Sequence, residues 1–266
     1  MFSFISKPLG QFMYFIYNTV GLHNYGLAII IFTIIVRLLM LPLTVKQYRS
    51  NAKLQEIQPQ LQEIQKRYKN DKEKLNTEIA KLYQENNVNP VGGCLPLLIQ
   101  MPILFALWGV ISRPVTYMLG RGSEVASLLA AIPEESRIRG YDELSIVIYN
   151  KLLNMNFLGL NLGLVPTLDI KKIISEPQYA ALLLIPLLAA GLTYLSSRLT
   201  MVSSNTGTKN DKQMGNSMNS MMIVGTLMTL FFSFQFPAGL VLYWIAGSVI
   251  QIFQQLYINK HVLKKK

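Results

Sequence analysis

Arg37 is the single charged residue inside a long apolar stretch, residues 24–45. About 20 apolar residues suffice for a helix to cross a bilayer, so this stretch is long enough to span one. A charge inside a span costs at least about 2.5–3.5 kcal/mol and usually serves a function. Arg37 precedes the first loop cation, Lys46, by nine residues, which is about 13 Å of helix and long for a snorkelling side chain. We therefore favour an Arg37 that faces a wet cavity open to that loop, with Thr33 and Thr44 on the same face.

Other reactive residue types are scarce in this sequence. Cys94 is the only cysteine, and the only histidines, His23 and His261, stand at opposite ends of the chain. Asp and Glu all lie outside the apolar runs, and the glycine-rich motifs that bind phosphates or dinucleotides are absent from the sequence. These observations disfavour a metal site, a catalytic dyad within the membrane and a nucleotide-driven mechanism. We expect no cofactor and no enzymatic activity.

The composition is typical of a polytopic membrane protein. The 266 residues are 51% hydrophobic and 15% charged, whereas soluble domains average about 25% charged residues. We predict an all-α fold with five transmembrane helices over residues 24–45, 91–111, 177–199, 218–235 and 239–258. Pro42 is expected to kink the first of them.

Residues 1–22 differ from a signal peptide because they lack a basic start and a small-residue cleavage site. A polar stripe at helical spacing predicts a helix that lies in the membrane interface on the outer side. Its members are Lys7, Gln11, Tyr14 and Asn18. We expect Pro8 and Gly10 to break this helix early, which argues against a span.

Residues 46–90 are polar and charged, with apolar residues spaced alternately by three and four. This pattern predicts a helical hairpin with a coiled-coil-like seam. Asn70 and Asp71 are candidate caps for its second helix, and Pro59 is expected to kink its first. The hairpin is either a solvated linker or an arm that docks a partner or touches lipid.

Residues 112–176 form a polar insertion of mixed charge. Within it, residues 152–166 are apolar but too few for a span. We expect an interfacial or partly re-entrant segment there; the alternative is an additional crossing.

Polar side chains also recur within the later spans. Gln100 lies in the second span, Thr229 belongs to a stripe with Met222, Thr226 and Ser233, and Trp244, Ser248, Gln251 and Gln255 form a second stripe. Such residues either join helices to one another or share a hydrophilic lining with Arg37.

The distribution of charged residues predicts how the protein is oriented in the membrane. Five spans place the hairpin, the loop at residues 200–217 with the adjoining Arg198, and the tail at residues 259–266 on one side, with sixteen Lys/Arg against seven Asp/Glu. The opposite side has eight against seven. The positive-inside rule therefore predicts an outer N-terminus and a cytoplasmic C-terminus.

With these features in place, the sequence resembles the YidC/Oxa/Alb family of membrane protein insertases. The resemblance covers residues 10–258 apart from the outer insertion. It rests on Arg37 within IIVRLLMLPLT, the hairpin QPQLQEIQKRYKND, Asn89-Pro90, Gly92-Gly93-Cys94-Leu95-Pro96, Gln100-Met101-Pro102-Ile103, Phe236-Pro237-Ala238-Gly239-Leu240 and Leu242-Tyr243-Trp244.

The resemblance implies a hydrophilic groove open to the cytoplasm and to lipid but closed to the outside, in a bacterial plasma membrane. Arg37 matches the groove arginine and Trp244 the aromatic residue of the last span. Implied partners are nascent membrane proteins, the ribosome, a Sec-type translocon and the signal recognition particle pathway. The basic tail is expected to contact the ribosome through Lys260, Lys264, Lys265 and Lys266. We also expect contacts with anionic lipids and no sequence-specific nucleic-acid binding.

This sequence departs from the family pattern in several places. We expect no large periplasmic domain and no lipoprotein signal, and the outer insertion is longer than the core requires. Ser196 and Ser197 replace a frequent Gln, and Ile245 to Ser248 stand where Asn is frequent.

We expect a mechanism without covalent chemistry, in which the groove takes up the polar tail of a nascent segment. Arg37 attracts acidic residues of that tail, and the groove residues Thr33, Gln100, Ser196, Thr229, Trp244, Ser248 and Gln251 line its path. Three alternatives stay open: an anion transporter with Arg37 as ligand, an intramembrane enzyme and a structural membrane subunit. The absence of a visible internal repeat disfavours the transporter.

Overall fold

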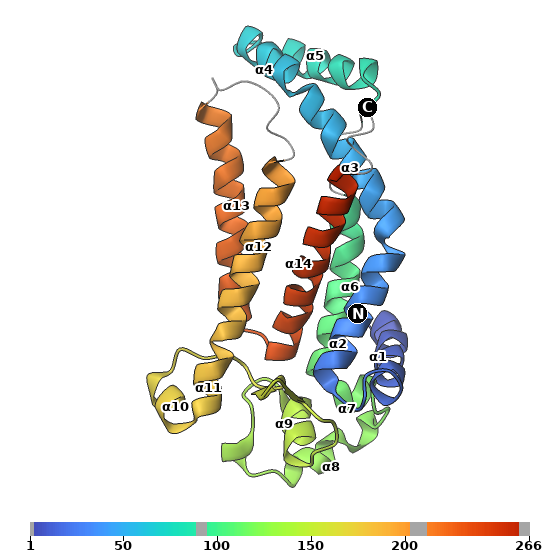
Figure 1. Ribbon diagram of the computed structural model, residues 1–266, viewed down its shortest axis with the longest axis vertical. Coiled ribbons are helices and arrows are strands. Elements are labelled where there is room, and N and C mark those ends of the chain that lie inside the picture. The colour runs from blue at the N-terminus through green and yellow to red at the C-terminus, as the bar shows by residue number, and fades with distance from the viewer. Residues whose placement is uncertain (1–2, 89–94, 203–211, 261–266) are drawn as a thin grey trace.

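The computed structural model describes all residues except 1–2, 89–94, 203–211 and 261–266, and the side chains of 55, 95–99, 200–202, 212–219 and 221 are also left aside. Long helices run side by side along the molecule, with a helical hairpin at one end and a compact cap at the other (Figure 1). The long helices are α2 (Tyr25–Leu39), α3 (Leu41–Glu56), α6 (Leu95–Ser112), α12 (Leu184–Val202), α13 (Lys212–Ser233) and α14 (Ala238–Ile258).

Two of the described helical segments, Pro177–Leu199 and Ala238–Ile258, are long and apolar enough to cross a membrane, and the bent pair α2–α3 adds a third. The described apolar parts of α6 and α13 are shorter, Gln100–Ser112 and Met222–Ser233. Large apolar side chains are exposed along α12 and α13, among them Leu187, Leu195, Leu227 and Phe231. Such exposure is unfavourable in water and favourable in lipid, so the fold is that of an all-α membrane protein. The five-span topology stays a prediction.

The first predicted span is interrupted at Met40, where α2 and α3 meet at a bend of 59°. Pro42 is the second residue of α3, a position where a helix needs no backbone N–H. Its ring would clash with the carbonyl of Leu38 if the helix continued straight. The expected kink is therefore present, and it begins two residues before the proline.

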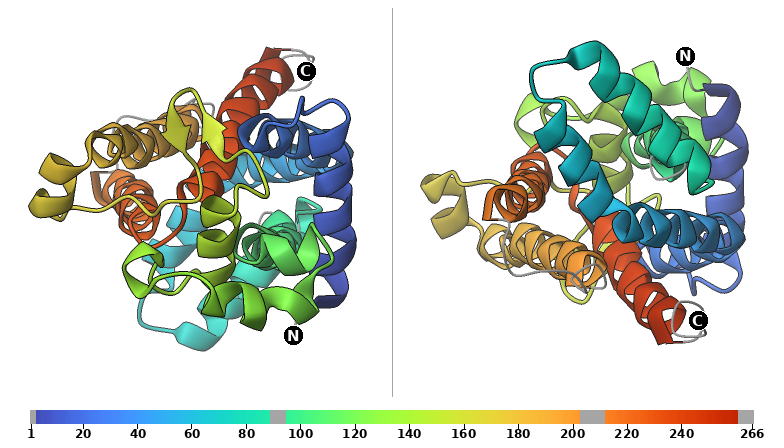
Figure 2. Two further views of the ribbon diagram at one scale, coloured as in Figure 1. Left: turned by 90° about the horizontal axis from the view of Figure 1, so that it is seen from below. Right: turned by 90° about the horizontal axis from the view of Figure 1, so that it is seen from above.

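Helix α1 (Ser3–Asn18) runs unbroken through Pro8 and Gly10, so the expectation of an early break is wrong. It lies across the long axis of the bundle (Figure 2), with Lys7 and Gln11 exposed. Gly10 serves packing instead of breaking the helix, because a Cβ there would lie 2.7 Å from the Tyr117 carbonyl carbon. The crosswise placement is what the interfacial prediction requires.

The hairpin consists of the end of α3, α4 (Gln58–Arg67) and α5 (Lys72–Glu85). Asp71 caps α5 by accepting a 3.1 Å hydrogen bond from the Lys74 backbone N–H. The break before α4 falls at Ile57, next to the predicted proline. Buried Ile57, Leu82 and Val88 form the centre of the seam. The hairpin is thus a separate small apolar cluster beyond the ends of the long helices.

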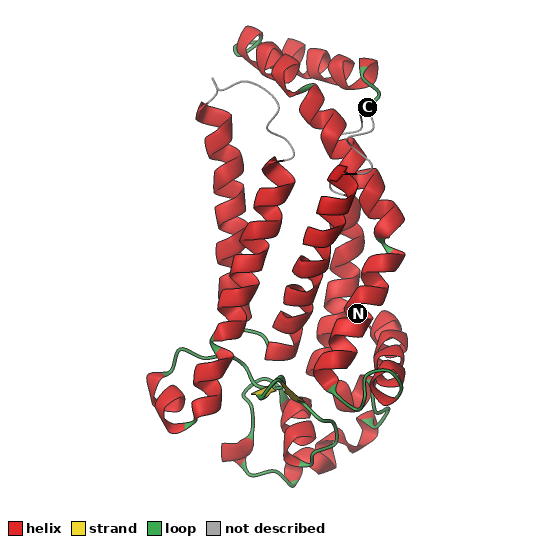
Figure 3. Cartoon of the chain, viewed as in Figure 1, coloured by secondary structure: helices red, strands yellow, loops and turns green. Residues whose placement is uncertain are grey.

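The segment between α6 and α12 forms the cap at the opposite end of the molecule (Figure 3). Its elements are α7 (Pro114–Tyr117), η2 (Gly122–Glu124), α8 (Val125–Ala130), η3 (Glu134–Ser136), α9 (Asp142–Tyr149), β1 (Asn156–Phe157), β2 (Leu160–Asn161), α10 (Ile170–Ser175) and α11 (Pro177–Leu182). Residues 152–166 contain the antiparallel hairpin β1–β2 and no helix. Apolar side chains such as Met155 and Leu162 are buried against protein, so this segment is a capping hairpin, and its expected interfacial or partly re-entrant position stays a prediction.

This cap is hydrogen-bonded to the ends of two long helices. The first N–H groups of a helix have no partner within it. At the start of α14, Ala238 and Gly239 donate to the carbonyls of Leu164 and Leu162, both at 2.8 Å, and Tyr25 of α2 donates to Asn154 at 3.0 Å. The cap backbone therefore satisfies these donors and holds α2 and α14 together at this end.

Candidate functional site

Arg37 lies near the end of α2, three residues before the bend, and its guanidinium rests on α14. A Cβ on Gly247 would lie only 2.9 Å from Arg37 Nη2, so the absence of a side chain makes room for the cation. Gly247 is the tenth of the 21 residues of α14, about 14 Å from the start of that helix. The guanidinium is therefore placed near mid-helix, far from either end.

The charge of Arg37 has no acidic partner among the described residues. The ion pairs found there join Lys74 to Asp71, Lys81 to Glu85 and Arg121 to Glu124. Arg37 itself is half-buried, and its Nε is buried without a hydrogen-bond partner. A buried donor left unsatisfied costs about 1–3 kcal/mol, and more when it is charged. The site is thus prepared for an acceptor that the described protein does not supply.

Two tyrosines lie within electrostatic range of Arg37 and connect it to predicted polar residues. Gln100 Nε2 of α6 donates a 2.7 Å hydrogen bond to the hydroxyl of Tyr243 on α14. Tyr48 on α3 lies beside Gln251 of α14. Three helices, α3, α6 and α14, thereby contribute polar groups around one cation of α2.

Gln254, one turn beyond Gln251, also contacts the site. Its Nε2 donates to the backbone carbonyl of Arg37 at 3.2 Å, while its Oε1 is buried without a partner. This bond takes up a carbonyl at the end of α2, which the bend would otherwise leave free. Gln254 therefore fixes the backbone from which the arginine projects.

The other predicted groove residues lie at varying distances from this centre. Thr33 is fully buried and donates to the Ile29 carbonyl at 2.6 Å, so it presents no polar group to a cavity and we remove it from the lining. Ser196 of α12 is buried, and Thr229 of α13 donates to Gly225 of its own helix. Trp244 and Ser248 are half-buried on α14.

Trp244 belongs to an aromatic cluster between α14 and the turn that precedes it. Its ring meets Phe236 edge-to-face at 5.9 Å, and Phe236 contacts Trp108 of α6 at 6.3 Å. The cluster lies on the cap side of Arg37, because Phe236 precedes the first residue of α14. Trp244 therefore packs against Phe236 on the cap side of Gly247.

Sequence reasoning missed Tyr48, Tyr243, Gly247 and Gln254. The last three recur at helical spacing on α14, one residue before the predicted stripe of Trp244, Ser248 and Gln255. A shift of one residue rotates a helix face by about 100°. The sequence did contain a signal for this face, because Tyr243, Gly247 and Gln254 combine two polar side chains with a glycine on one side of the helix.

Replacing Tyr243 by Phe tests the connection between α6 and α14. The variant removes the acceptor of Gln100 Nε2, and we expect a loss of about 1 kcal/mol in folding stability. Thermal unfolding in detergent measures it, with Tyr149→Phe as the matched control because Tyr149 is half-exposed on α9. Equal unfolding temperatures of the two variants would show that the hydrogen bond carries no stability.

A metal is not needed to explain this arrangement. Among residues 3–88, 95–202 and 212–260, no group of three or more His, Cys, Asp and Glu side chains lies close enough to hold a metal ion. The chemistry available at the site is the binding of an anion or a polar chain by one guanidinium, three amides and two phenols.

Comparison with known proteins gives a consistent result over nearly the whole chain. The model of the family described as 60Kd inner membrane protein matches residues 15–266. A protein of Oceanobacillus iheyensis named membrane protein insertase YidC is 38% identical over 255 residues, which are 94% of this chain and 81% of that relative. Proteins of the same name from Fusobacterium nucleatum and Clostridium perfringens are 34% and 38% identical, covering 97% and 91% of this chain and 98% and 82% of those relatives.

Proposed function

This chain belongs to the YidC/Oxa family of membrane protein insertases, and from that premise we propose how its site around Arg37 carries out insertion. The protein is embedded in the membrane and acts on nascent membrane proteins. In the proposed mechanism, the polar tail or short loop of a nascent segment enters a hydrophilic groove next to Arg37. No nucleotide hydrolysis is required.

The observation that carries this proposal is the guanidinium of Arg37 at mid-helix, whose Nε is buried without a hydrogen-bond partner in the described part of the protein. An acidic residue of the substrate tail would supply the missing acceptor and form a charge-assisted hydrogen bond, which is stronger than a neutral one. The bond is temporary, because the tail continues outward. The arginine thus lowers the cost of moving a carboxylate through the membrane without holding it permanently.

The driving force comes from the apolar part of the substrate. Transfer of apolar surface out of water contributes about 25 cal/mol per Å², so a single span supplies ample free energy. The polar tail opposes this transfer, and a groove that reaches mid-membrane shortens its apolar path. Exposed apolar side chains on α12, including Leu188 and Leu195, offer a lipid-side surface along which the span can slide.

The same proposal assigns an orientation and partners. The cap lies outside, where its hydrogen bonds to α2 and α14 support a groove closed to that side. The α4–α5 hairpin lies in the cytoplasm and receives the nascent chain, and the C-terminus is also cytoplasmic. Lys260 is exposed, and the rest of the basic tail lies outside the described residues. Ribosome contact by this tail, and cooperation with a Sec-type translocon and the signal recognition particle, are further parts of the proposal.

Site-specific photocrosslinking tests the substrate path. A photoreactive residue replaces Gln100, Ser248 or Thr229 in membrane vesicles, and ribosome-bound nascent chains of a short single-span protein are supplied. We expect adducts at Gln100 and Ser248, which lie near Arg37, and weaker adducts at Thr229. Phe253 is the control, because it is 68% exposed on the same helix as Ser248.

Adducts at Phe253 alone, with the protein intact in the vesicles, would contradict the path beside Arg37. Equal adducts at all four positions would indicate nonspecific collision with the nascent chain.

A further inference from the structure

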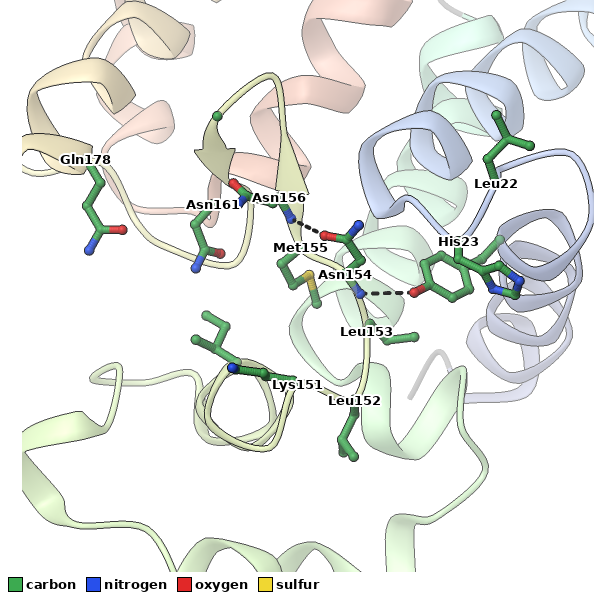
Figure 4. Close-up of a pocket in the computed structure, with 13 residues that line it drawn as sticks. Leu22, His23, Lys151, Leu152, Leu153, Asn154, Met155, Asn156, Asn161 and Gln178 are labelled. Atoms are coloured by element: carbon green, nitrogen blue, oxygen red, sulfur yellow. Dashed lines mark hydrogen bonds between the residues drawn. The ribbon is translucent and has the colours of Figure 1, made fainter.

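The outer face carries a second polar feature that lies apart from Arg37. A pocket of about 700 Å³ opens between the loop after α1, the end of α9 and the β1–β2 hairpin (Figure 4). His23, Lys151, Asn154, Asn161 and Gln178 are among its lining residues, and none of its lining residues is acidic. We propose that this pocket binds the phosphate group of a phospholipid in the outer leaflet.

Hydrogen bonding leaves two asparagine NH₂ groups of the pocket as donors, whereas Gln178 Nε2 already donates to the Glu176 carboxylate at 2.7 Å. Asn154 Oδ1 accepts from the Asn156 N–H, and Asn161 Oδ1 accepts from the Gly163 N–H, both at 3.1 Å. These bonds fix which end of each amide is the oxygen. Neither side-chain NH₂ group has a hydrogen bond to the described part of the protein among the contacts found. Together with the Lys151 ammonium, these NH₂ groups favour an anion with several oxygen acceptors, such as a phosphate.

The helices beside the pocket indicate its depth relative to the bilayer. His23 precedes α2 by two residues, and Gln178 is the second residue of the span that begins at Pro177. Residues next to the start of an apolar span lie at the headgroup level of a bilayer. Helix α1, which ends just before this loop, lies across the bundle axis at the same end of the molecule (Figure 2). The pocket is therefore at the height of lipid phosphates if these helices cross the membrane as proposed.

Two leucines beside the pocket are exposed and held in an unfavourable backbone conformation. Leu22 has φ of 52° and is 74% exposed, and Leu158 has φ of 51° and is 86% exposed. For a residue with a Cβ the left-handed region costs roughly 1–2 kcal/mol. Burial within the protein does not compensate for this conformational cost at either leucine.

The unfavourable backbone conformation is clearest at Leu158. It begins the two-residue turn Leu158–Gly159 between paired Phe157 and Leu160, with positive φ at both turn residues. Asn-Gly is the sequence that such a turn favours. A leucine here is explained if its side chain enters lipid, where burial stabilises it by about 1.5–3 kcal/mol. Leu22 lines the pocket, and Leu158 lies at the tip of the hairpin that borders it. The two leucines thus fit an acyl chain region, and the pocket fits a phosphate.

A depth measurement tests the leucine tips. Leu158→Cys in a Cys94→Ser background is labelled with bimane and reconstituted in vesicles of phosphatidylcholine and phosphatidylglycerol, 3:1, that contain lipid spin-labelled at the headgroup or at carbon 5. We expect strong quenching by both. Ser136→Cys, exposed on η3 and not in the pocket lining, is the control and should be quenched little. Equal weak quenching at both positions would overturn the proposal.

A titration tests the phosphate. Short-chain dihexanoyl phosphatidylglycerol is added to the bimane-labelled protein in detergent, and the emission shift is followed. We expect saturation, about tenfold weaker binding in Lys151→Gln because one charge-assisted contact is lost, and no change in Lys171→Gln, an exposed lysine of α10 outside the pocket. Inorganic phosphate that competes at the same concentration, without quenching in vesicles, would overturn the lipid assignment in favour of a free anion.

A stability control separates the fold from the lipid contact. Leu158→Asn should leave the unfolding temperature in detergent equal or higher, because it restores the favoured turn sequence. A clear decrease would show that Leu158 serves the fold itself and would contradict the argument from strain. These tests involve no nascent chain, so their failure leaves the insertion mechanism untouched.

Discussion

Replacing Arg37 by alanine should slow the insertion of substrates with acidic translocated tails by about tenfold or more. The reason is the loss of a charge-assisted hydrogen bond at mid-membrane, where such bonds contribute about 1.5–3 kcal/mol. Arg37→Lys keeps the charge and should be impaired much less. Insertion into vesicles, measured for one single-span substrate whose tail carries either two acidic residues or two serines, separates the effects.

The serine-tailed substrate is the internal control for folding. A fold defect of Arg37→Ala would reduce both substrates alike, whereas the proposed role reduces the acidic one selectively. Equal insertion by the wild type and both variants would contradict the electrostatic role proposed for Arg37. Gly247→Ala adds a second check, because its Cβ would push against Nη2 at 2.9 Å and displace the cation without removing it. We expect it to behave like a weaker form of Arg37→Ala.

Gly10→Ala should clearly lower the stability of this protein, because the added Cβ would meet the backbone of α7. The new Cβ would lie 2.7 Å from the carbonyl carbon and 2.8 Å from the Cβ of Tyr117. The backbone of α7 cannot rotate away as a long side chain can, so α1 must separate from it. Overpacking of this kind costs about 1–3 kcal/mol or more, equivalent to a fall of about 2–4 °C in the unfolding temperature per kcal/mol. Thermal unfolding in detergent measures this.

Gly191→Ala is the matched control for this variant. Gly191 lies within α12, and its Cβ would meet no atom within 4 Å. Alanine is also favoured over glycine in a helix by about 1 kcal/mol, so the unfolding temperature should stay equal or rise. A Gly10→Ala protein as stable as Gly191→Ala would show that α1 is loosely docked and can shift without cost.

Local patterns determined much of the architecture from the sequence. Pro42 and Pro59 marked the two breaks near Met40 and Ile57, because a proline has no backbone N–H and its ring clashes with the preceding turn. The same residue type did not break α1, which continues through Pro8. Asp71 marked a helix start, because its side chain bonds to an N–H only three residues away. The membrane class followed from apolar length and low charge alone. The family followed from motifs spread along the chain and is confirmed by the match over residues 15–266.

Arg37 as the centre of the site was also accessible from the sequence, because a lone charge in an apolar run has few structural explanations. The residues that surround Arg37 could not be identified from the sequence. Tyr243 lies 206 residues away along the chain, and the predicted stripe on α14 was displaced by one residue. Periodicity identifies which residues share a face, but the rotation of that face toward another helix depends on packing. Only the tertiary structure placed Gly247 beneath the guanidinium.

The same distinction explains α1 and the cap. Glycine at position 10 has the residue type of a helix breaker, and its role as a close-packing site depends on the Tyr117 backbone, which lies far along the chain. Residues 152–166 have an apolar composition that fits membrane and protein core equally well. The burial of Met155 and Leu162 beside the cap ends of α2 and α14 showed that this segment packs as part of the cap, with Leu158 exposed at its turn. The sequence by itself determined which segments are apolar, helical and charged, because these are local properties, and the tertiary structure decided which surfaces meet, because contact depends on residues distant in the chain.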